Sequence, residues 1–345
     1  MLAVDLGGRT TKAIHVERRG QGFALCGYTL LDAPIFEKTL PADLLMEHLK
    51  AVAQALGAKC KTVTFAVGAN DVLVRHAEMP RLSADDRRLV LRHSSRVYLQ
   101  QELSNHVFDC HVLALAGPDQ PSNPAVSPKA LPGPPKQKIL VAGARKELID
   151  ELVDGTRRAG LAVECIVPGL IAPVNALERA LPDVFANESV ALVDLGFRNT
   201  SICIVQRGEL ILSRVVGIGG DRVTRGLAEA LNVSYAEAEG IKIGMPTEVQ
   251  PQLESLLLPL GRELRTSIDF FEHQQDRPVT SVFLTGGGSR SEFILQRLRQ
   301  ELMLECKVLN PTAFLEMQLS PQQSSEIEQV GPQLAVALGA ALAAL

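Results

Sequence analysis

The sequence carries one strand–turn–strand pattern twice, and this repeat most constrains what the chain can fold into. The first copy spans 3–16, AVDLGGRTTKAIHV, where an apolar strand ends at Asp5 and a glycine turn opens a second strand. The second copy spans 189–205, SVALVDLGFRNTSICIV, with Asp194 at the same point. One such turn is common in hairpins that bind nothing. Two, in separate halves of a chain, indicate two related lobes that face one phosphate group.

Both turns contain groups that suit a phosphate and its metal ion. Glycine lets backbone N–H groups approach closely, hydroxyl, amide and lysine groups donate hydrogen bonds, and an aspartate can hold Mg²⁺ through water. We therefore expect Asp5 and Asp194 to hold Mg²⁺ in this way. The predicted phosphate-binding residues are Asp5, Gly7, Gly8, Thr10, Thr11 and Lys12 in the first copy, and Asp194, Gly196, Asn199 and Thr200 in the second.

A third segment, 281–289 with the sequence SVFLTGGGS, reads as a buried strand running into a glycine turn that opens a helix. Such a turn lets a nucleotide lie against bare backbone. The predicted contacts here are Gly286, Gly287, Gly288 and Ser289. In the second hairpin, Arg198 either reaches the terminal phosphate or points to solvent.

In this order, the three segments resemble the phosphate-1, phosphate-2 and adenosine loops of the actin-like ATPase superfamily. The segment 217–224, GIGGDRVT, resembles the entry to the small subdomain of lobe 2, and 238–244, AEGIKIG, resembles the helix used against ribose and adenine. The resemblance implies an α/β, ribonuclease H-like fold of two lobes with ATP or ADP and Mg²⁺ in the cleft. It adds Gly219, Gly220, Glu239 and Lys242 to the predicted site.

Arg265 is a further candidate contact, because a guanidinium plane stacks well on adenine. The alternative for Arg265 is a surface ion pair with Glu263 or Asp269.

Within the superfamily, the chain is similar to the PilM family of type IV pilus assembly. The segments that carry this narrower resemblance are 140–149, 159–161, 262–271 and 310–311. In that family, a groove between subdomains 1A and 1C binds the N-terminal cytoplasmic peptide of the membrane protein PilN. The resemblance thus implies a cytoplasmic scaffold held at the inner membrane through a PilN-like partner. It also allows contacts with other platform proteins, the assembly ATPase and further copies of the chain.

We expect the chain to divide as this resemblance suggests. The expected parts are lobe 1 (1A) at 1–79, a 1C-type insert at 80–165, a return to lobe 1 at 166–187, and lobe 2 (2A/2B) at 188–345 ending in a closing helix. Within the insert, 117–137 holds seven of the 20 prolines and predicts a tether, or else a ligand for a proline-binding domain. An arginine-rich helix after Ser83 is either a solvated face or the wall of a groove. The long helix predicted over 250–274 should break or kink near Pro259.

Composition excludes several partners. A net charge of −4 with interspersed signs gives no footprint for nucleic acid. No apolar run approaches the length of a membrane span, no leader is visible, and the tail 331–345 lacks lysine and arginine, so we expect no direct membrane insertion. The six cysteines lack metal-site spacing and are typical of free thiols in a reducing compartment.

Hydrolysis is expected to be weak or absent, and no residue is assigned a catalytic role. Actin-like enzymes usually have an acidic or amide side chain just before a proline at the end of lobe 1, whereas this chain has Val167 before Pro168 and its nearest carboxylate is Glu164. Three alternatives remain open: the cytoplasmic part of a GspL-like type II secretion protein, an FtsA-like polymerising ATPase, and a small-molecule kinase of the same superfamily.

Overall fold

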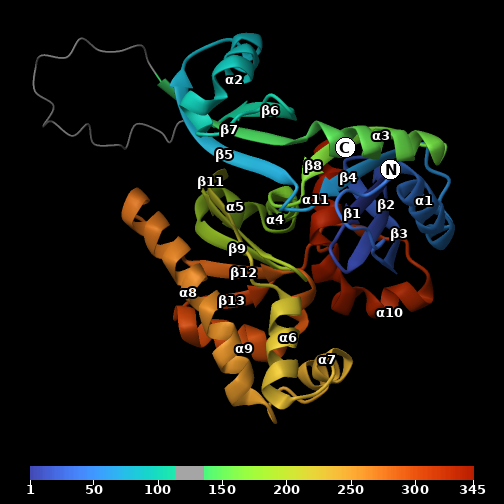
Figure 1. The fold of residues 1–345 in the computed structure, drawn as a ribbon, viewed down its shortest axis with the longest axis vertical. Coiled ribbons are helices and arrows are strands. Elements are labelled where there is room, and N and C mark those ends of the chain that lie inside the picture. Colours follow the sequence, from blue (N-terminus) through green and yellow to red (C-terminus); the bar gives the residue numbers. More distant parts are fainter. Residues whose placement is uncertain (114–135) are drawn as a thin grey trace, which may run out of the picture. The chain divides into compact units, whose positions relative to one another are not determined.

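The computed structural model describes residues 1–113 and 136–345, so most of the predicted proline-rich segment 117–137 lies outside the described residues. The chain forms two compact units (Figure 1): Met1–Asn70 together with Asp150–Leu345, and Asp71–Ile149. The small unit therefore spans Asp71–Ile149, whereas the predicted insert spanned 80–165. The strand before residue 80 pairs inside the small unit, whereas the strand at 162–168 pairs inside the large one.

The first sheet of the large unit has the order β14-β3-β2-β1-β4-β8. Strands β1 to β3 form an antiparallel meander, and β4 and β8 then continue the sheet in parallel with β1. The strands are β1 (Leu2–Leu6), β2 (Thr10–Arg19), β3 (Gly22–Asp32), β4 (Thr62–Val67), β8 (Ala162–Pro168) and β14 (Glu316–Met317).

The second sheet repeats this plan, with the order β11-β10-β9-β12-β13. Again an antiparallel meander is followed by two parallel strands. The strands are β9 (Ser189–Leu195), β10 (Thr200–Gln206), β11 (Glu209–Val216), β12 (Ser281–Thr285) and β13 (Glu305–Val308). The two predicted hairpins, β1–β2 and β9–β10, thus occupy equivalent central positions.

Helices cover both sheets of the large unit. Those on or beside the first sheet are α1 (Ala42–Leu56), α3 (Lys146–Arg158), α4 (Ala172–Ala180), α10 (Pro321–Val330), η2 (Gly331–Leu334) and α11 (Ala335–Ala344). Those that belong with the second sheet are α5 (Pro182–Asn187), α6 (Gly220–Leu231), α7 (Tyr235–Gly244), α8 (Gln250–Gln275), η1 (Gly287–Arg290) and α9 (Glu292–Leu302).

The C-terminal tail lies with the first sheet, although the predicted lobe 2 ran to residue 345. Strand β14 pairs with β3, and α11 packs against α4 and the strands β1, β4 and β8. The stretch Pro321–Ala344 is long and apolar enough to cross a membrane by length and composition, with a mean hydropathy of 1.2, which corrects the expectation that no run reaches that length. However, 61% of its most apolar window is buried, as for a core helix.

Helix α8 runs through Pro259 as one helix, so the break predicted there does not occur. Leu253 and Leu257 before the proline, and Leu264 and Ile268 after it, are all buried. Because tertiary packing of an apolar face supplies most of a helix's stability, this continuous face outweighs the local cost of proline.

The small unit is a three-stranded antiparallel sheet, β5-β7-β6, with helix α2 on it. The elements are β5 (Val72–Pro80), α2 (Ala84–Leu99), β6 (His106–Val112) and β7 (Lys136–Arg145). Its own core includes Met79, Leu91, Ile139 and Val141, all fully or almost fully buried. The unit therefore has a separate hydrophobic centre.

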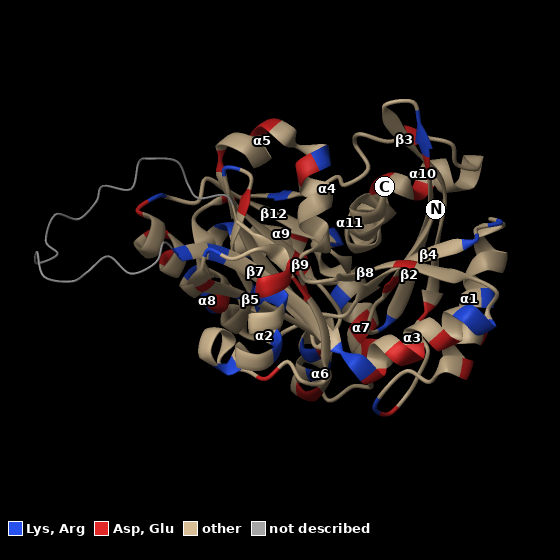
Figure 2. Ribbon diagram, turned by 90° about the horizontal axis from the view of Figure 1, so that it is seen from above, with Lys and Arg blue, Asp and Glu red and all other residues tan. Residues whose placement is uncertain are grey.

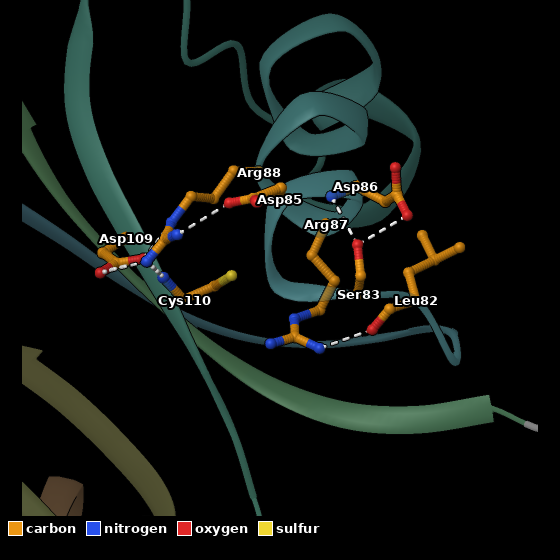
Figure 3. A network of polar contacts seen from close by, with 8 residues as sticks. All are labelled: Leu82, Ser83, Asp85, Asp86, Arg87, Arg88, Asp109 and Cys110. Atoms are coloured by element: carbon orange, nitrogen blue, oxygen red, sulfur yellow. Dashed lines mark hydrogen bonds and ion pairs between the residues drawn. The ribbon is translucent and has the colours of Figure 1, made fainter.

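Most of the arginines noted on α2 serve the small unit itself (Figure 3). Arg88 donates to both carboxylate oxygens of Asp109 on β6, at 2.9 and 3.2 Å, and Arg87 donates to the Leu82 carbonyl at 2.7 Å. Arg96 pairs with Glu102 at 2.7 Å. The predicted helix start is confirmed, since the Ser83 hydroxyl accepts from the Asp86 N–H.

Acidic and basic residues are scattered among one another over the helices and strands (Figure 2).

Candidate functional site

The first hairpin places a carboxylate against a lysine at the base of its turn. Asp5 on β1 is opposite Lys12 on β2 in the strand register, and the Lys12 Nζ lies 3.1 Å from Asp5 Oδ2. Asp5 is buried and Lys12 only slightly exposed. Gly7 has no room for a side chain, because a Cβ there would lie 2.5 Å from both the Thr10 carbonyl oxygen and Lys12 Nζ.

The second hairpin has the same backbone but no lysine of its own. Asp194 on β9 is opposite Ser201 on β10, and a Cβ on Gly196 would lie 2.8 Å from the Asn199 carbonyl oxygen. Burial raises the pKa of Asp194 to about 6, against the opposing charge of Lys12. Burial alone would lower the pKa of Lys12, but the charges of Asp5 and Asp194 outweigh it and raise that pKa. One lysine therefore serves two carboxylates.

The third glycine segment lies directly against the second hairpin. Gly286 has a φ of +81°, and a Cβ there would collide with the Asp194 carboxylate and the Leu195 backbone. A Cβ on Gly288 would lie 2.8 Å from Leu195 Cβ, and Gly287 borders Gln333. These glycines bring bare backbone to the edge of the Asp194 carboxylate.

The segment that opens α6 packs on the turn of the second hairpin. The Gly220 N–H donates to the Gly196 carbonyl at 3.0 Å, and the Asp221 N–H donates to the Phe197 carbonyl at 2.9 Å. Gly219 has no room for a Cβ beside Phe197 and Arg198. These first N–H groups of α6 thus position the turn.

Glu239 and Lys242 form an ion pair on α7, and both contact Thr224, which the sequence analysis did not select. Lys242 Nζ lies 2.6 Å from the Glu239 carboxylate and 2.7 Å from the Thr224 hydroxyl, which itself donates to Glu239. Burial would raise the pKa of Glu239, but hydrogen bonds from Lys242, Thr224 and Arg9 outweigh it and lower the pKa to about 2. Glu239 is therefore a permanent anion at the mouth of the site.

The tips of the two hairpins touch each other. The Arg9 guanidinium lies 2.8 Å from the Glu239 carboxylate and 5.6 Å from the centre of the Phe197 ring. A Cβ on Gly8 would lie 3.2 Å from the Arg198 side chain. Arg9 was missed because a turn arginine looks solvated in sequence, and only its place between two turn glycines and Thr10 hinted at a role.

A hollow of about 430 Å³ opens beside these tips. It is lined by Arg9, Phe197, Arg198, Asp221, Arg225 and Tyr235. Asp221 is already paired there, with Arg225 at 3.0 Å and with the Tyr235 hydroxyl at 3.0 Å. Three guanidinium groups against one carboxylate give this hollow a positive balance.

Several predicted residues are hydrogen-bonded or ion-paired within the protein. The Thr11 hydroxyl bonds His48 at 2.8 Å, the Thr200 hydroxyl donates to the Ile218 carbonyl at 2.6 Å, and the Ser289 hydroxyl donates to the Gly286 carbonyl at 2.7 Å. All three residues are buried. Arg265 stands apart on α8, where its ion pair with Asp269 at 3.7 Å matches the surface alternative.

The residues present fit a phosphate group and a hard divalent cation. Asp5 and Asp194 supply carboxylate oxygens, the ligand type that Mg²⁺ prefers, and usually reaches partly through water. Burial and the neighbouring Asp5 charge raise the pKa of Asp194 to about 6, although Lys12 opposes them. A divalent cation would supply the missing positive charge.

The end of β8 offers no carboxylate for hydrolysis. Val167 is buried in an apolar cluster with Ala66 and Val336. A Cβ on Gly169 would lie 2.7 Å from the Val67 carbonyl oxygen, and Glu164 is exposed further back on the strand. This junction is therefore built for packing.

Comparison with known proteins gives a family and a fold. A family model described as "Type IV pilus assembly protein PilM" matches residues 3–345. The solved structure of a PilM-PilN type IV pilus biogenesis complex is similar over 99% of this chain and 98% of that chain, with a TM-score of 0.82 and 22% identity. An archaeal actin homologue is similar over 99% and 98%, with a TM-score of 0.50 and 14% identity.

Among curated relatives, the cell division protein FtsA of Bacillus subtilis is 33% identical over 103 residues. That match spans 30% of this chain and 22% of the length of FtsA.

Proposed function

Because the chain belongs to the PilM family of type IV pilus assembly proteins, we propose that it is an actin-like, nucleotide-binding scaffold of the pilus assembly platform. In this proposal, ATP or ADP with Mg²⁺ binds between the two hairpins, and a PilN-like membrane protein binds through its N-terminal cytoplasmic peptide. The nucleotide sets the geometry of the lobes and so tunes the affinity for that peptide.

The proposal that the protein binds a nucleotide is supported above all by one observation. Four residues lie together at the site: Asp5, Lys12, Asp194 and Gly286. They come from three separate segments, and a Cβ on Gly286 would have no room beside the Asp194 carboxylate. A cation between two carboxylates, next to backbone that only glycine can form, is an arrangement suited to a metal-bound phosphate. When bound, Mg²⁺ would neutralise phosphate charge beside Asp5 and Asp194.

The cleft side chains would then bind and orient the nucleotide. Lys12 would donate a hydrogen bond to phosphate, and Glu239 would accept hydrogen bonds from ribose hydroxyls. The base would lie against the backbone of Gly286, Gly287 and Gly288, which carry no side chain. Slow turnover is part of the proposal, since Val167 is packed in the core and orients no water.

The peptide half of the proposal is supported by the family and by features of the small unit. Its three-stranded sheet has β5 and β6 as outer strands. Large apolar side chains are exposed on it, at Leu89, Val97 and Val107. Edge strands and exposed apolar side chains are what an extended peptide uses for main-chain pairing and specificity.

The same proposal places the protein on the cytoplasmic side of the inner membrane, held there by its partner. Other platform proteins, the assembly ATPase and further copies of the chain are additional proposed contacts.

The deciding experiment is a calorimetric titration of the full chain with the N-terminal cytoplasmic peptide of the PilN-like protein, with and without Mg-ATP. Calorimetry suits a chain without tryptophan, whose intrinsic fluorescence is weak. We expect binding whose affinity changes about 5-fold or more with nucleotide, the usual size of an allosteric coupling. A scrambled peptide of the same composition is the control.

Two results would count against the proposal. Peptide binding that is identical with and without Mg-ATP would remove the coupling. Absence of peptide binding together with rapid ATP hydrolysis, lost in Asp194→Ala, would favour an enzyme.

The segment shared with FtsA favours one second candidate, a polymerising ATPase. Filaments seen by electron microscopy after addition of Mg-ATP, and absent with Mg-ADP, would support it over the scaffold.

A further inference from the structure

A second group of metal-binding side chains lies on the first sheet, away from the cleft. His15 and Glu17 are on β2 and Cys26 is on β3. One ligand atom from each, an imidazole nitrogen, a carboxylate oxygen and a sulfur, all lie within 4.8 Å of one another.

A β-bulge brings the cysteine to this face. His15 pairs with Gly27, but the next residue, Val16, pairs with Leu25, so Cys26 is the extra residue in the ladder. Val16 and Leu25 point into the apolar core under α11. Without the bulge, alternation would send Cys26 to that core face, whereas the bulge re-aims it toward His15 and Glu17.

This face is protected but not closed. A Cβ built on Gly27 would lie 3.7 Å from the Leu56 side chain at the end of α1, so α1 covers one flank. The His15 side chain is 20% exposed and that of Glu17 is 45% exposed. An ion can therefore enter from solvent.

The distances fit an ion better than a direct contact. His15 Nε2 lies 3.8 Å from Glu17 Oε1, which is too long for a hydrogen bond. A histidine nitrogen and a carboxylate oxygen at about 2.0–2.2 Å from a tetrahedral zinc ion are roughly 3.3–3.6 Å apart, so this pair would close by a few tenths of an ångström on binding an ion. The Gln318 side-chain oxygen lies 3.9 Å from Cys26 Sγ as a further polar neighbour.

We propose that His15, Glu17 and Cys26 bind one zinc-class divalent cation, with water completing the coordination. Thiolate, imidazole and carboxylate together select zinc or a similar borderline metal, whereas the all-oxygen pair Asp5 and Asp194 suits Mg²⁺. The ion links β2 to β3 at the bulge and stabilises the first sheet by binding only the folded chain.

The test begins with the full chain stripped of metal by EDTA and titrated, without nucleotide, with Zn²⁺ and separately with Co²⁺. We expect one ion per chain with micromolar or tighter affinity, a higher melting temperature with Zn²⁺, and a cobalt spectrum with sulfur-to-metal charge transfer.

Variants identify the ligands. Because even outer-shell changes weaken metal sites 10–100-fold, we expect Cys26→Ser and His15→Gln each to weaken Zn²⁺ binding by about 100-fold. Cys26→Ser should also lose the charge-transfer band. Cys110→Ser, at a half-buried free cysteine of the small unit, and His111→Gln nearby are the matched controls and should bind as the unchanged protein does.

A second measurement needs no variant. Alkylation of the folded chain followed by peptide mass mapping should show Zn²⁺ protecting Cys26 selectively among the six cysteines. Protection of a different cysteine, equal Zn²⁺ affinity in Cys26→Ser, or no stoichiometric binding would each overturn the proposal.

Discussion

The two central hairpins have the same backbone arrangement, but only the first carries a lysine opposite its aspartate. In β1–β2, the residue opposite Asp5 is Lys12, whose Nζ lies 3.1 Å away, whereas in β9–β10 the residue opposite Asp194 is Ser201. The first carboxylate therefore has a cation opposite it, whereas burial raises the pKa of the second to about 6. A repeated hairpin can therefore keep its backbone while the charged residues around its aspartate differ. Lys12 interacts with the aspartates of both hairpins and so links the two halves of the site.

The largest effect is expected from removing that shared lysine. Lys12→Met leaves Asp5 and Asp194 without their cation, so we expect a loss of about 3 kcal/mol in the free energy of unfolding, and roughly 100-fold weaker Mg-ATP binding. Urea denaturation and calorimetry measure the two. Lys50→Met, at an exposed lysine paired only with Glu47, is the control and should change stability by less than about 0.5 kcal/mol. Equal stability of the two variants would contradict a shared role for Lys12.

The next largest effect is expected from replacing each hairpin's aspartate by asparagine, which should change the free energy of unfolding in opposite directions in the two hairpins. The folded-state pKa of Asp194, about 6, lies above the roughly 3.9 of an unfolded aspartate, so the folded chain binds this proton more tightly. Its contribution to stability is therefore full below about pH 4 and is lost as the pH rises through about 6. Asp194→Asn should be more stable than the unchanged protein at pH 8, by about 2 kcal/mol, and equal to it near pH 4.

Asp5→Asn is the matched change in the other hairpin, and should destabilise at pH 8 by about 1 kcal/mol, because it removes the hydrogen-bonded partner of Lys12. Urea denaturation at both pH values checks the pair. The same sign for both variants would mean that the hairpins are electrostatically equivalent.

Substituting the turn glycines tests whether the two hairpins have the same backbone geometry, although their charged residues differ. Gly7→Ala and Gly196→Ala each push a Cβ against a carbonyl oxygen, so each should cost about 1–2 kcal/mol, with Gly7 the larger because Lys12 is also displaced. Thermal and urea unfolding measure the loss. Gly240→Ala on α7, where nothing lies within 4 Å, should instead gain up to about 1 kcal/mol. A loss at Gly240 would show that alanine harms the fold for another reason.

The smallest effect is expected at the contact between the tips. Arg9 is half exposed, so Arg9→Ala should cost less than about 1 kcal/mol, and a double-mutant cycle with Glu239→Gln should give a coupling of a few tenths. Arg225→Ala removes an ion pair within α6 and should show no coupling to Glu239. A coupling above about 2 kcal/mol would make the tips a principal link between the hairpins.

Local patterns were enough to place the hairpins and the third glycine turn, because alternation of apolar residues and glycine at a close turn are short-range rules. The helix that carries Glu239 and Lys242 was selected instead by its resemblance to a helix of actin-like ATPases. The break expected as one outcome at Pro259 does not occur, because a buried face on both sides of the proline keeps α8 continuous. The pairing of β14 with β3 from the other end of the chain had no local signal.

The sequence by itself determined the repeat and the residue types available for phosphate and metal, because these depend on periodicity and on the chemistry of each residue, and its resemblance to actin-like ATPases indicated the type of fold. Only the tertiary structure decided which hydroxyls are already bonded within the protein, that Lys12 serves both aspartates, and that Arg9 reaches Glu239. Those outcomes depend on burial and on contacts between residues far apart in the chain. A linear sequence does not encode such distances directly.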